Sequence, residues 1–150
     1  MLKDLLVSID INGESLQGIG GAHVALALQL PFLVSRFPVL AGCHPGTLNI
    51  QLDQPLRVAN PNFVSPPIRW HPQHQPPEIF SFIEVSLDLP LGSSRGRAWI
   101  CIPFHSPHFH NVYQVELIAP FIADLAATAV GTRCCIHIPK PHTTRALIII

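Results

Sequence analysis

The chain has 150 residues, the size of one ordinary domain, and 48% of them are apolar while only 12% are charged. Such a composition argues against extended disorder. Nine Lys and Arg balance nine Asp and Glu, so the molecule lacks the net basic field that binders of nucleic acid or anionic membranes usually carry. We therefore expect a single domain over residues 1–150, with neither nucleic acid nor membrane as a partner; the composition leaves the oligomeric state open.

The N-terminal segment and the cysteines bear on the compartment. Residues 1–11 contain three charged side chains and no small-residue cleavage site, so a secretory signal is not expected. The longest apolar stretch, Val24–Val34, is interrupted by Gln29 and Pro31 and is too short to span a bilayer. The four cysteines have no CxxC spacing and are expected to be buried free thiols. These features predict a cytoplasmic protein.

Sixteen prolines spread along the chain favour short strands over long helices. Residues 5–11 are expected to form a strand that ends in a hairpin turn at Asn12-Gly13. After a glycine-dense turn at 18–21, the apolar run His23–Leu30 predicts a buried strand, with a short helix as the alternative. In Leu48–Leu52, apolar and polar residues alternate, which predicts a strand with one face in the core.

The second half of the chain begins with residues 60–77, which hold six prolines and predict a long irregular loop. Strands are then expected at 79–87 and 98–103, paired across a Gly/Ser-rich turn, followed by a short helix at 121–129, a closing strand at 133–138 and a tail at 142–150. About six strands with one or two short helices favour a small closed β-barrel over a sandwich, because closure removes exposed strand edges.

The segment His44–Asp53 carries the most chemical information. Thr47 and Asn49 lie two positions apart on a predicted strand, so their side-chain oxygens face the same side. Both oxygens are uncharged, and such groups hold Mg²⁺ when phosphate oxygens supply most of the negative charge. The pattern predicts a metal that arrives with a nucleotide, although an ordinary turn followed by a strand would also explain these residues.

Four motifs occur in one order along the chain, from about Ser15 to Ile138. They are Gly18-Ile19-Gly20-Gly21, Pro45-Gly46-Thr47-Leu48-Asn49, Phe80-Ser81-Phe82 and Val115-Glu116-Leu117-Ile118-Ala119-Pro120. Together they resemble the archaeal-type CTP-dependent riboflavin kinases. The resemblance implies a six-stranded cradle-loop barrel that transfers the terminal phosphate of CTP to the 5′-hydroxyl of riboflavin, giving FMN.

The same resemblance implies roles for individual residues. Thr47 and Asn49 match the Mg²⁺ ligands of that family. Glu116 matches a flavin-contacting glutamate and could accept a proton from the attacking hydroxyl. His108 stands at the position of a flavin-contacting threonine. The residues that match nucleotide-binding positions are Gly18, Ile19, Gly20, Gly21, Ala22, Phe121, Ile122, Ala123 and Asp124.

The loop Phe104–His110 departs from the family pattern, since it lacks the expected arginine and threonine. Ala22 also stands where another glycine is common, and it would be strained if that position requires a positive φ. These departures motivate an alternative, a flavin- or nucleotide-binding barrel without kinase activity; a third possibility is an interaction module that uses the proline-rich loop. His105, His108 and His110 are expected to line a surface or substrate loop and not a transition-metal site, because no carboxylate is near them in sequence.

Overall fold

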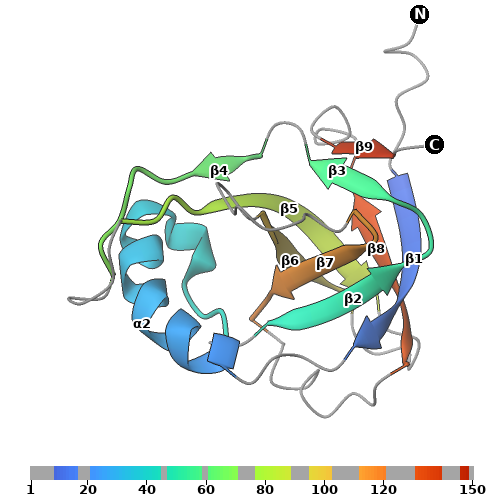
Figure 1. Ribbon diagram of the computed structural model, residues 1–150, viewed down its shortest axis with the longest axis horizontal. Helices are drawn as coiled ribbons and strands as arrows, with labels where there is room; N and C mark the ends of the chain where they lie inside the picture. Colours follow the sequence, from blue (N-terminus) through green and yellow to red (C-terminus); the bar gives the residue numbers. More distant parts are fainter. Residues whose placement is uncertain are drawn as a thin grey trace, which may run out of the picture.

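The structure is a computed structural model, and it describes residues 9–16, 21–44, 47–58, 61–70, 77–88, 95–102, 112–120, 131–139 and 146–148. Six antiparallel strands close into a barrel (Figure 1). In spatial order these are β5 (Ser81–Asp88), β6 (Arg95–Ile102), β7 (Gln114–Ile118), β2 (Leu48–Leu52), β1 (Ile9–Leu16) and β8 (Arg133–Ile138). The barrel closes because β8 pairs back onto β5, with Leu87 opposite Ile136. The prediction of a mainly β protein built on a small six-stranded barrel is confirmed.

Alternation along each strand determines which side chains fill the barrel. On β2, Leu48, Ile50 and Leu52 are buried and face inward, whereas Asn49 and Gln51 are half-buried and face outward. The same period of two appears in β5, β7 and β8. The inward residues form one apolar cluster, and burying each large side chain in it contributes about 1.5–3 kcal/mol.

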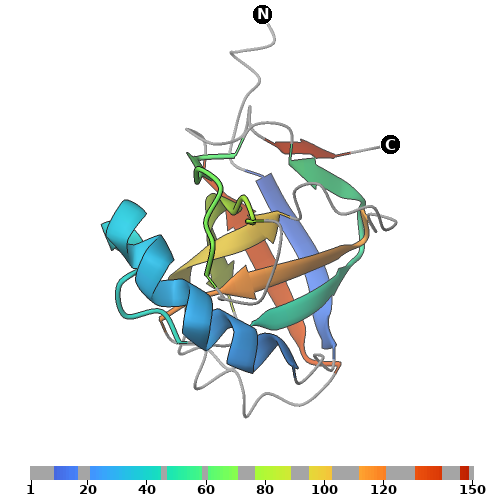
Figure 2. The same ribbon diagram turned by 60° about the vertical axis from the view of Figure 1, so that its left-hand side comes forward.

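A second apolar layer covers part of the outer face of the barrel. The helix α2 (Gly21–Arg36) lies outside the barrel and is followed by the 3-10 turn η1 (Pro38–Leu40) (Figures 1 and 2). Leu33 of α2 and Leu40 of η1 are fully buried in a cluster with outward-facing side chains of β5, β6 and β7. Those side chains are Phe82, Trp99 and Ile118.

Short strands complete the described part of the chain. β4 (Phe63–Val64) pairs with the first residues of β5, on the edge that β8 occupies further along. β3 (Leu56–Val58) pairs with β9 (Ala146–Ile148), so part of the C-terminal tail adds a strand. None of the helices in the described ranges is long and apolar enough to cross a membrane.

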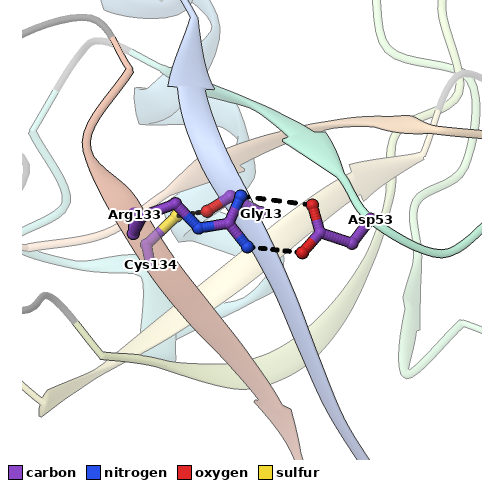
Figure 3. Close-up of polar contacts among 4 residues, drawn as sticks. All are labelled: Gly13, Asp53, Arg133 and Cys134. Carbon is purple, nitrogen blue, oxygen red and sulfur yellow. Dashed lines mark hydrogen bonds and ion pairs between the residues drawn. The ribbon is translucent and has the colours of Figure 1, made fainter.

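An ion pair crosses β1 on the outside of the barrel (Figure 3). Arg133 at the start of β8 donates two hydrogen bonds to the carboxylate of Asp53, which follows β2. The bond from Arg133 is the main reason that the pKa of Asp53 lies below its ordinary value. Beneath the pair, the Cys134 thiol donates to the Gly13 carbonyl oxygen at 3.6 Å.

Two local predictions are wrong. The run His23–Leu30 lies within α2, so the strand is wrong and the alternative of a helix is correct. Its alanine, leucine and glutamine residues are good helix formers. Asn12-Gly13 does not form a hairpin turn, because β1 continues through both residues, with Gly13 between Leu52 and Cys134. The barrel nevertheless has six strands, because β7, where no strand was expected, is the sixth.

The proline-rich segment 60–77 is more regular than expected. It contains β4 and a β-bridge between Ile68 and Glu78. Ser65 is 4% exposed; its hydroxyl accepts from the Phe80 N–H at 2.8 Å and donates to the Pro66 carbonyl at 2.8 Å. Residues 71–76 and the helix predicted at 121–129 lie outside the described residues.

Candidate functional site

The site is built on the pairing of β2 with β7. In this antiparallel ladder, Asn49 is directly opposite Glu116. Residues paired in this way project from the same face of a sheet with Cβ atoms about 4.5–5.5 Å apart. Both residues are half-buried and alternate with inward-facing neighbours, so both project from the outer face. Thr47, directly before β2, is also half-buried and has the same parity as Asn49.

Glu116 has neighbours on both sides of β7. On the β6 side its partner is Cys101, and on the β2 side its partner is Asn49. Asn49 is in turn paired with Leu16, the last residue of β1. Burial raises the pKa of the Cys101 thiol well above its ordinary value, and the nearby carboxylate of Glu116 raises it further. Because Cys101 and Glu116 are paired across β6 and β7, both side chains project from the same face of these strands.

The beginning of α2 lies beside the beginning of β2 in both views (Figures 1 and 2). Gly21 and Ala22 are the first two residues of this helix. The first N–H groups of a helix have no partner within the helix and favour anions such as phosphate. Because helical residues have negative φ, Ala22 is not strained at this position, and the strain expected for a positive φ does not arise.

The segment that leads into Thr47 is attached to the end of β7. The His44 N–H donates to the Ala119 carbonyl oxygen at 3.2 Å. Cys43, one residue earlier, packs in the outer apolar cluster, and burial raises the pKa of its thiol to about 11. A thiol held protonated in this way is a poor nucleophile. Cys43 and Cys134 are buried free thiols as expected, whereas Cys101 and Cys135 are only half-buried.

Several predicted site residues lie outside the described part of the chain. They are Gly18, Ile19, Gly20, His105, His108, His110, Phe121, Ile122, Ala123 and Asp124. Of the predicted residues, the structure therefore describes Thr47, Asn49 and Glu116 on one outer face and the backbone of Gly21 and Ala22 at the start of α2. Within the described ranges, no three His, Cys, Asp or Glu side chains are grouped as a metal site.

Two further features lie near this region without joining it. Arg97 pairs with Glu84 and stacks over Trp99 at 5.5 Å, so protein partners account for its position. An apolar groove of about 440 Å³ lies between α2 and residues 40–43. Neither Asn49 nor Glu116 lines it. The groove is lined by Ala27, Leu30, Pro31, Val34, Leu40, Ala41, Gly42 and Cys43.

The sequence alone did not single out Cys101 as a neighbour of Glu116. These residues are fifteen positions apart in sequence, and only the β6–β7 register makes them neighbours. No local pattern in the sequence reports that register, although the strand prediction at 98–103 placed Cys101 in the correct element.

No protein-family model matches the chain, and no curated protein matches it either. The resemblance to riboflavin kinases remains a prediction that depends on the four motifs.

Proposed function

We propose that the protein is a CTP-dependent phosphotransferase of the riboflavin kinase type, which transfers the terminal phosphate of CTP to the 5′-hydroxyl of riboflavin. The observation that carries this proposal is the register that sets Asn49 opposite Glu116 on the outer face of β2 and β7. This pairing brings a predicted metal ligand next to the predicted catalytic carboxylate, and the start of α2 lies close by (Figure 2).

The donor set fits Mg²⁺. Thr47 and Asn49 offer two uncharged oxygens from half-buried positions of the same parity, and Mg²⁺ prefers oxygen ligands. Two neutral ligands leave most of the coordination shell to water and to phosphate oxygens. When bound, Mg²⁺ would neutralise negative charge on the transferred phosphate.

Glu116 would orient the 5′-hydroxyl of riboflavin and accept its proton. Its position on a strand, with Asn49 on one side and Cys101 on the other, restricts where the carboxylate can lie. Phosphoryl transfer depends mainly on positioning and on charge neutralisation, so a rigid strand pair is a suitable support. We further propose a cytoplasmic location, where a reducing environment keeps thiols free, as the four cysteines are here.

The alternative is a barrel that binds a flavin or a nucleotide without transferring phosphate. The observation that favours it is the sequence Phe104–His110, which has no counterpart of the kinases' arginine and has His108 at the threonine position, so that Ser106 could supply the hydroxyl only if the loop is shifted. Loss of one group that stabilises charge in the transition state commonly raises the activation free energy by about 3 kcal/mol.

One assay separates these two functions. Purified protein is incubated with riboflavin, CTP and Mg²⁺, and FMN is measured by chromatography with fluorescence detection; ATP replaces CTP in a parallel reaction. Formation of FMN supports the kinase. An increase in melting temperature with CTP or riboflavin, but no FMN, supports the binding barrel. If no FMN forms and neither ligand shifts the melting temperature, both functions are wrong.

Alanine substitution of the two proposed ligands tests the metal assignment. We expect Thr47→Ala and Asn49→Ala to lower the rate of FMN formation at least about a hundredfold, because charge on the phosphate would no longer be compensated. Gln51→Ala is the matched control, since Gln51 is also half-buried on the outer face of β2, two positions from Asn49. It should retain the rate within about twofold. Equal rates in the Asn49 and Gln51 variants would contradict the assignment.

A further inference from the structure

Three polar residues lie side by side on the outer face of the barrel, across β5, β8 and β1. His137 of β8 is directly opposite Asp10 of β1 on one side and directly opposite Ser86 of β5 on the other. All three alternate with buried, inward-facing neighbours, so all three project outward. The imidazole therefore lies between a carboxylate and a hydroxyl. We refer to Ser86, His137 and Asp10 as the Ser86 row.

The contact between His137 and Asp10 determines which nitrogen of the imidazole carries the proton. Nδ1 of His137 lies 2.5 Å from Oδ1 of Asp10. A carboxylate only accepts hydrogen bonds, so Nδ1 donates, and in the neutral imidazole Nε2 is then the proton acceptor. The two ring nitrogens point in nearly opposite directions, so Nε2 is directed away from β1. The His137 side chain is only 21% exposed, which limits the orientations open to it.

The Ser86 hydroxyl is the neighbour that can give a proton to Nε2. Directly opposed residues have Cβ atoms about 4.5–5.5 Å apart. Ser86 and His137 are not hydrogen-bonded in this structure, but rotation about the Cα–Cβ bond of Ser86 moves its Oγ toward the imidazole. Bonds between a nucleophile and its base are often long before substrate binds. Carboxylate, imidazole and hydroxyl in this order activate a serine as a nucleophile.

A cation lies on the other side of Ser86. Arg97 of β6 is directly opposite Ser86 and also projects outward. Its Nε donates to Glu84, and its guanidinium carbon lies 5.5 Å from the centre of the Trp99 ring. The bond to Glu84 comes from Nε, and a guanidinium has further N–H donors on its two terminal nitrogens. Such donors stabilise an oxygen anion that forms nearby.

We propose that the Ser86 row is a second active site, a serine esterase site that hydrolyses a carboxylic ester with a small acyl group. The row lies on the opposite side of the barrel from the pair Asn49 and Glu116, because β6 and β1 separate β5 and β8 from β7 and β2. None of its residues lines the apolar groove beside α2, so the row suits a small, unhindered acyl group. The inference is independent of the proposed kinase activity.

The reaction proceeds in two steps through an acyl-enzyme. Ser86 Oγ attacks the ester carbonyl carbon while His137 Nε2 accepts the hydroxyl proton, and negative charge forms on the carbonyl oxygen near Arg97. The bond from this carbon to the alcohol oxygen breaks, and His137 gives the proton to the leaving alcohol. Water then attacks the acyl group with His137 again as the base, the bond to Oγ breaks, and the proton returns to Ser86. Asp10 stabilises the imidazolium in both steps.

The first test uses the wild-type protein and needs no substitution. The protein is incubated with a fluorophosphonate, a reagent that modifies serines activated as nucleophiles, and the labelled peptide is identified by mass spectrometry. We expect the label on Ser86, and we expect hydrolysis of p-nitrophenyl acetate to fall in proportion to the labelled fraction. Absence of the label from Ser86, or full hydrolysis by the labelled protein, would overturn the inference.

Substitutions then test the role of each residue. We expect Ser86→Ala, His137→Gln and Asp10→Asn each to lower the rate of p-nitrophenyl acetate hydrolysis at least about tenfold, because the three act as a unit. Asp88→Asn is the matched control for Asp10→Asn, since Asp88 also projects outward but is opposite Cys135 of β8. It should retain the rate within about twofold.

Two results with these variants would contradict the esterase site. Equal rates in Asp10→Asn and Asp88→Asn would show that the contact with His137 has no part in the reaction. A loss in His137→Gln without a loss in Ser86→Ala would show that the imidazole hydrolyses the ester by itself, and the proposed role of Ser86 would be wrong.

Discussion

Gly13 lies in the middle of β1, between Leu52 of β2 and Cys134 of β8. A Cβ on this residue would come within 2.5 Å of the Gln51 carbonyl oxygen and 2.7 Å of the Ile50 Cγ2 atom. Carbon atoms do not approach backbone oxygens this closely, and the Gln51 carbonyl cannot move without disturbing the β1–β2 pairing. Glycine is therefore required here by space and not by a turn.

We expect Gly13→Ala to lower the free energy of unfolding by about 1–3 kcal/mol, because the added methyl group forces the strands apart. Urea unfolding followed by circular dichroism measures the change. The neighbouring Asn12 faces outward and is exposed, so Asn12→Ala should stay within about 0.5 kcal/mol of the wild type. A hairpin turn at Asn12-Gly13 would instead make both substitutions costly, and that result would contradict the continuous strand.

The pair Asn12-Gly13 also shows a limit of local sequence patterns. Glycine after asparagine is typical of a tight hairpin turn. Glycine is equally required where two backbones approach closely inside a sheet. Which of the two applies depends on whether the strands that contain Gln51 and Cys134 pair with the residues around Gly13. The sequence around Gly13 does not contain this information.

At the level of elements, the strands were predicted more accurately than the helix. Alternating residues identified β2, and apolar runs located β5, β6 and β8 to within three residues. The first part of α2 was predicted as a buried strand because the run His23–Leu30 is apolar, with a short helix as the alternative. A signal for the helix was present in the density of alanine and leucine before Pro31. Pro31 lies inside this helix and cannot donate to the carbonyl of Ala27; since Ala27 is exposed, water can bond to that carbonyl instead.

The outer layer predicts a sharp difference between adjacent residues of α2. Leu33 is 0% exposed, whereas Phe32 is 44% exposed. We expect Leu33→Ala to lower the free energy of unfolding by about 2–5 kcal/mol, because it leaves a cavity above the outward face of β5 and β6. Phe32→Ala should cost less than about 1 kcal/mol. Urea unfolding distinguishes the two, and equal losses would show that α2 is not packed as described.

The candidate site was predictable only in part, because local periodicity is visible in a sequence and strand register is not. Thr47 and Asn49 share a face by the period of a strand, which a sequence reports directly. That Asn49 is opposite Glu116 follows from the β2–β7 register, which links residues 67 positions apart. The hydrogen bond from the Thr132 N–H to the Ser15 hydroxyl joins residues still further apart, and nothing in the neighbourhood of Ser15 distinguishes it from any other serine in a strand.

At the level of the whole molecule, each of the two apolar layers contains a buried thiol. Cys134 belongs to the cluster inside the barrel, and Cys43 belongs to the cluster between α2 and the barrel. Burial raises the pKa of each thiol from the ordinary value of 9.0 to about 11. Burial also raises the pKa of the Cys101 thiol. The stability of both layers therefore depends on pH through a buried cysteine thiol.

This linkage predicts that the protein loses stability in alkaline solution. Below pH 9 the thiols of Cys43 and Cys134 are protonated in both the folded and the unfolded chain, so they add no pH dependence. Between pH 9 and about pH 11 the unfolded chain releases these protons while the folded chain retains them. The unfolded state then binds fewer protons than the folded state, and the free energy of unfolding falls as pH rises.

Urea midpoints measured from pH 8 to pH 10.5 test this expectation. Lysine and tyrosine side chains titrate in the same range, so the informative quantity is the difference between the wild type and the double variant Cys43→Ala/Cys134→Ala. We expect the midpoint of the variant to decline less steeply above pH 9, because two groups with raised pKa have been removed. Identical declines of the midpoint in the wild type and the double variant would rule out the linkage.

The single variants then separate the two layers. If Cys43→Ala and Cys134→Ala each make the decline of the midpoint above pH 9 similarly shallower, the outer layer and the barrel unfold together. If only Cys134→Ala makes the decline shallower, the outer layer opens before the barrel.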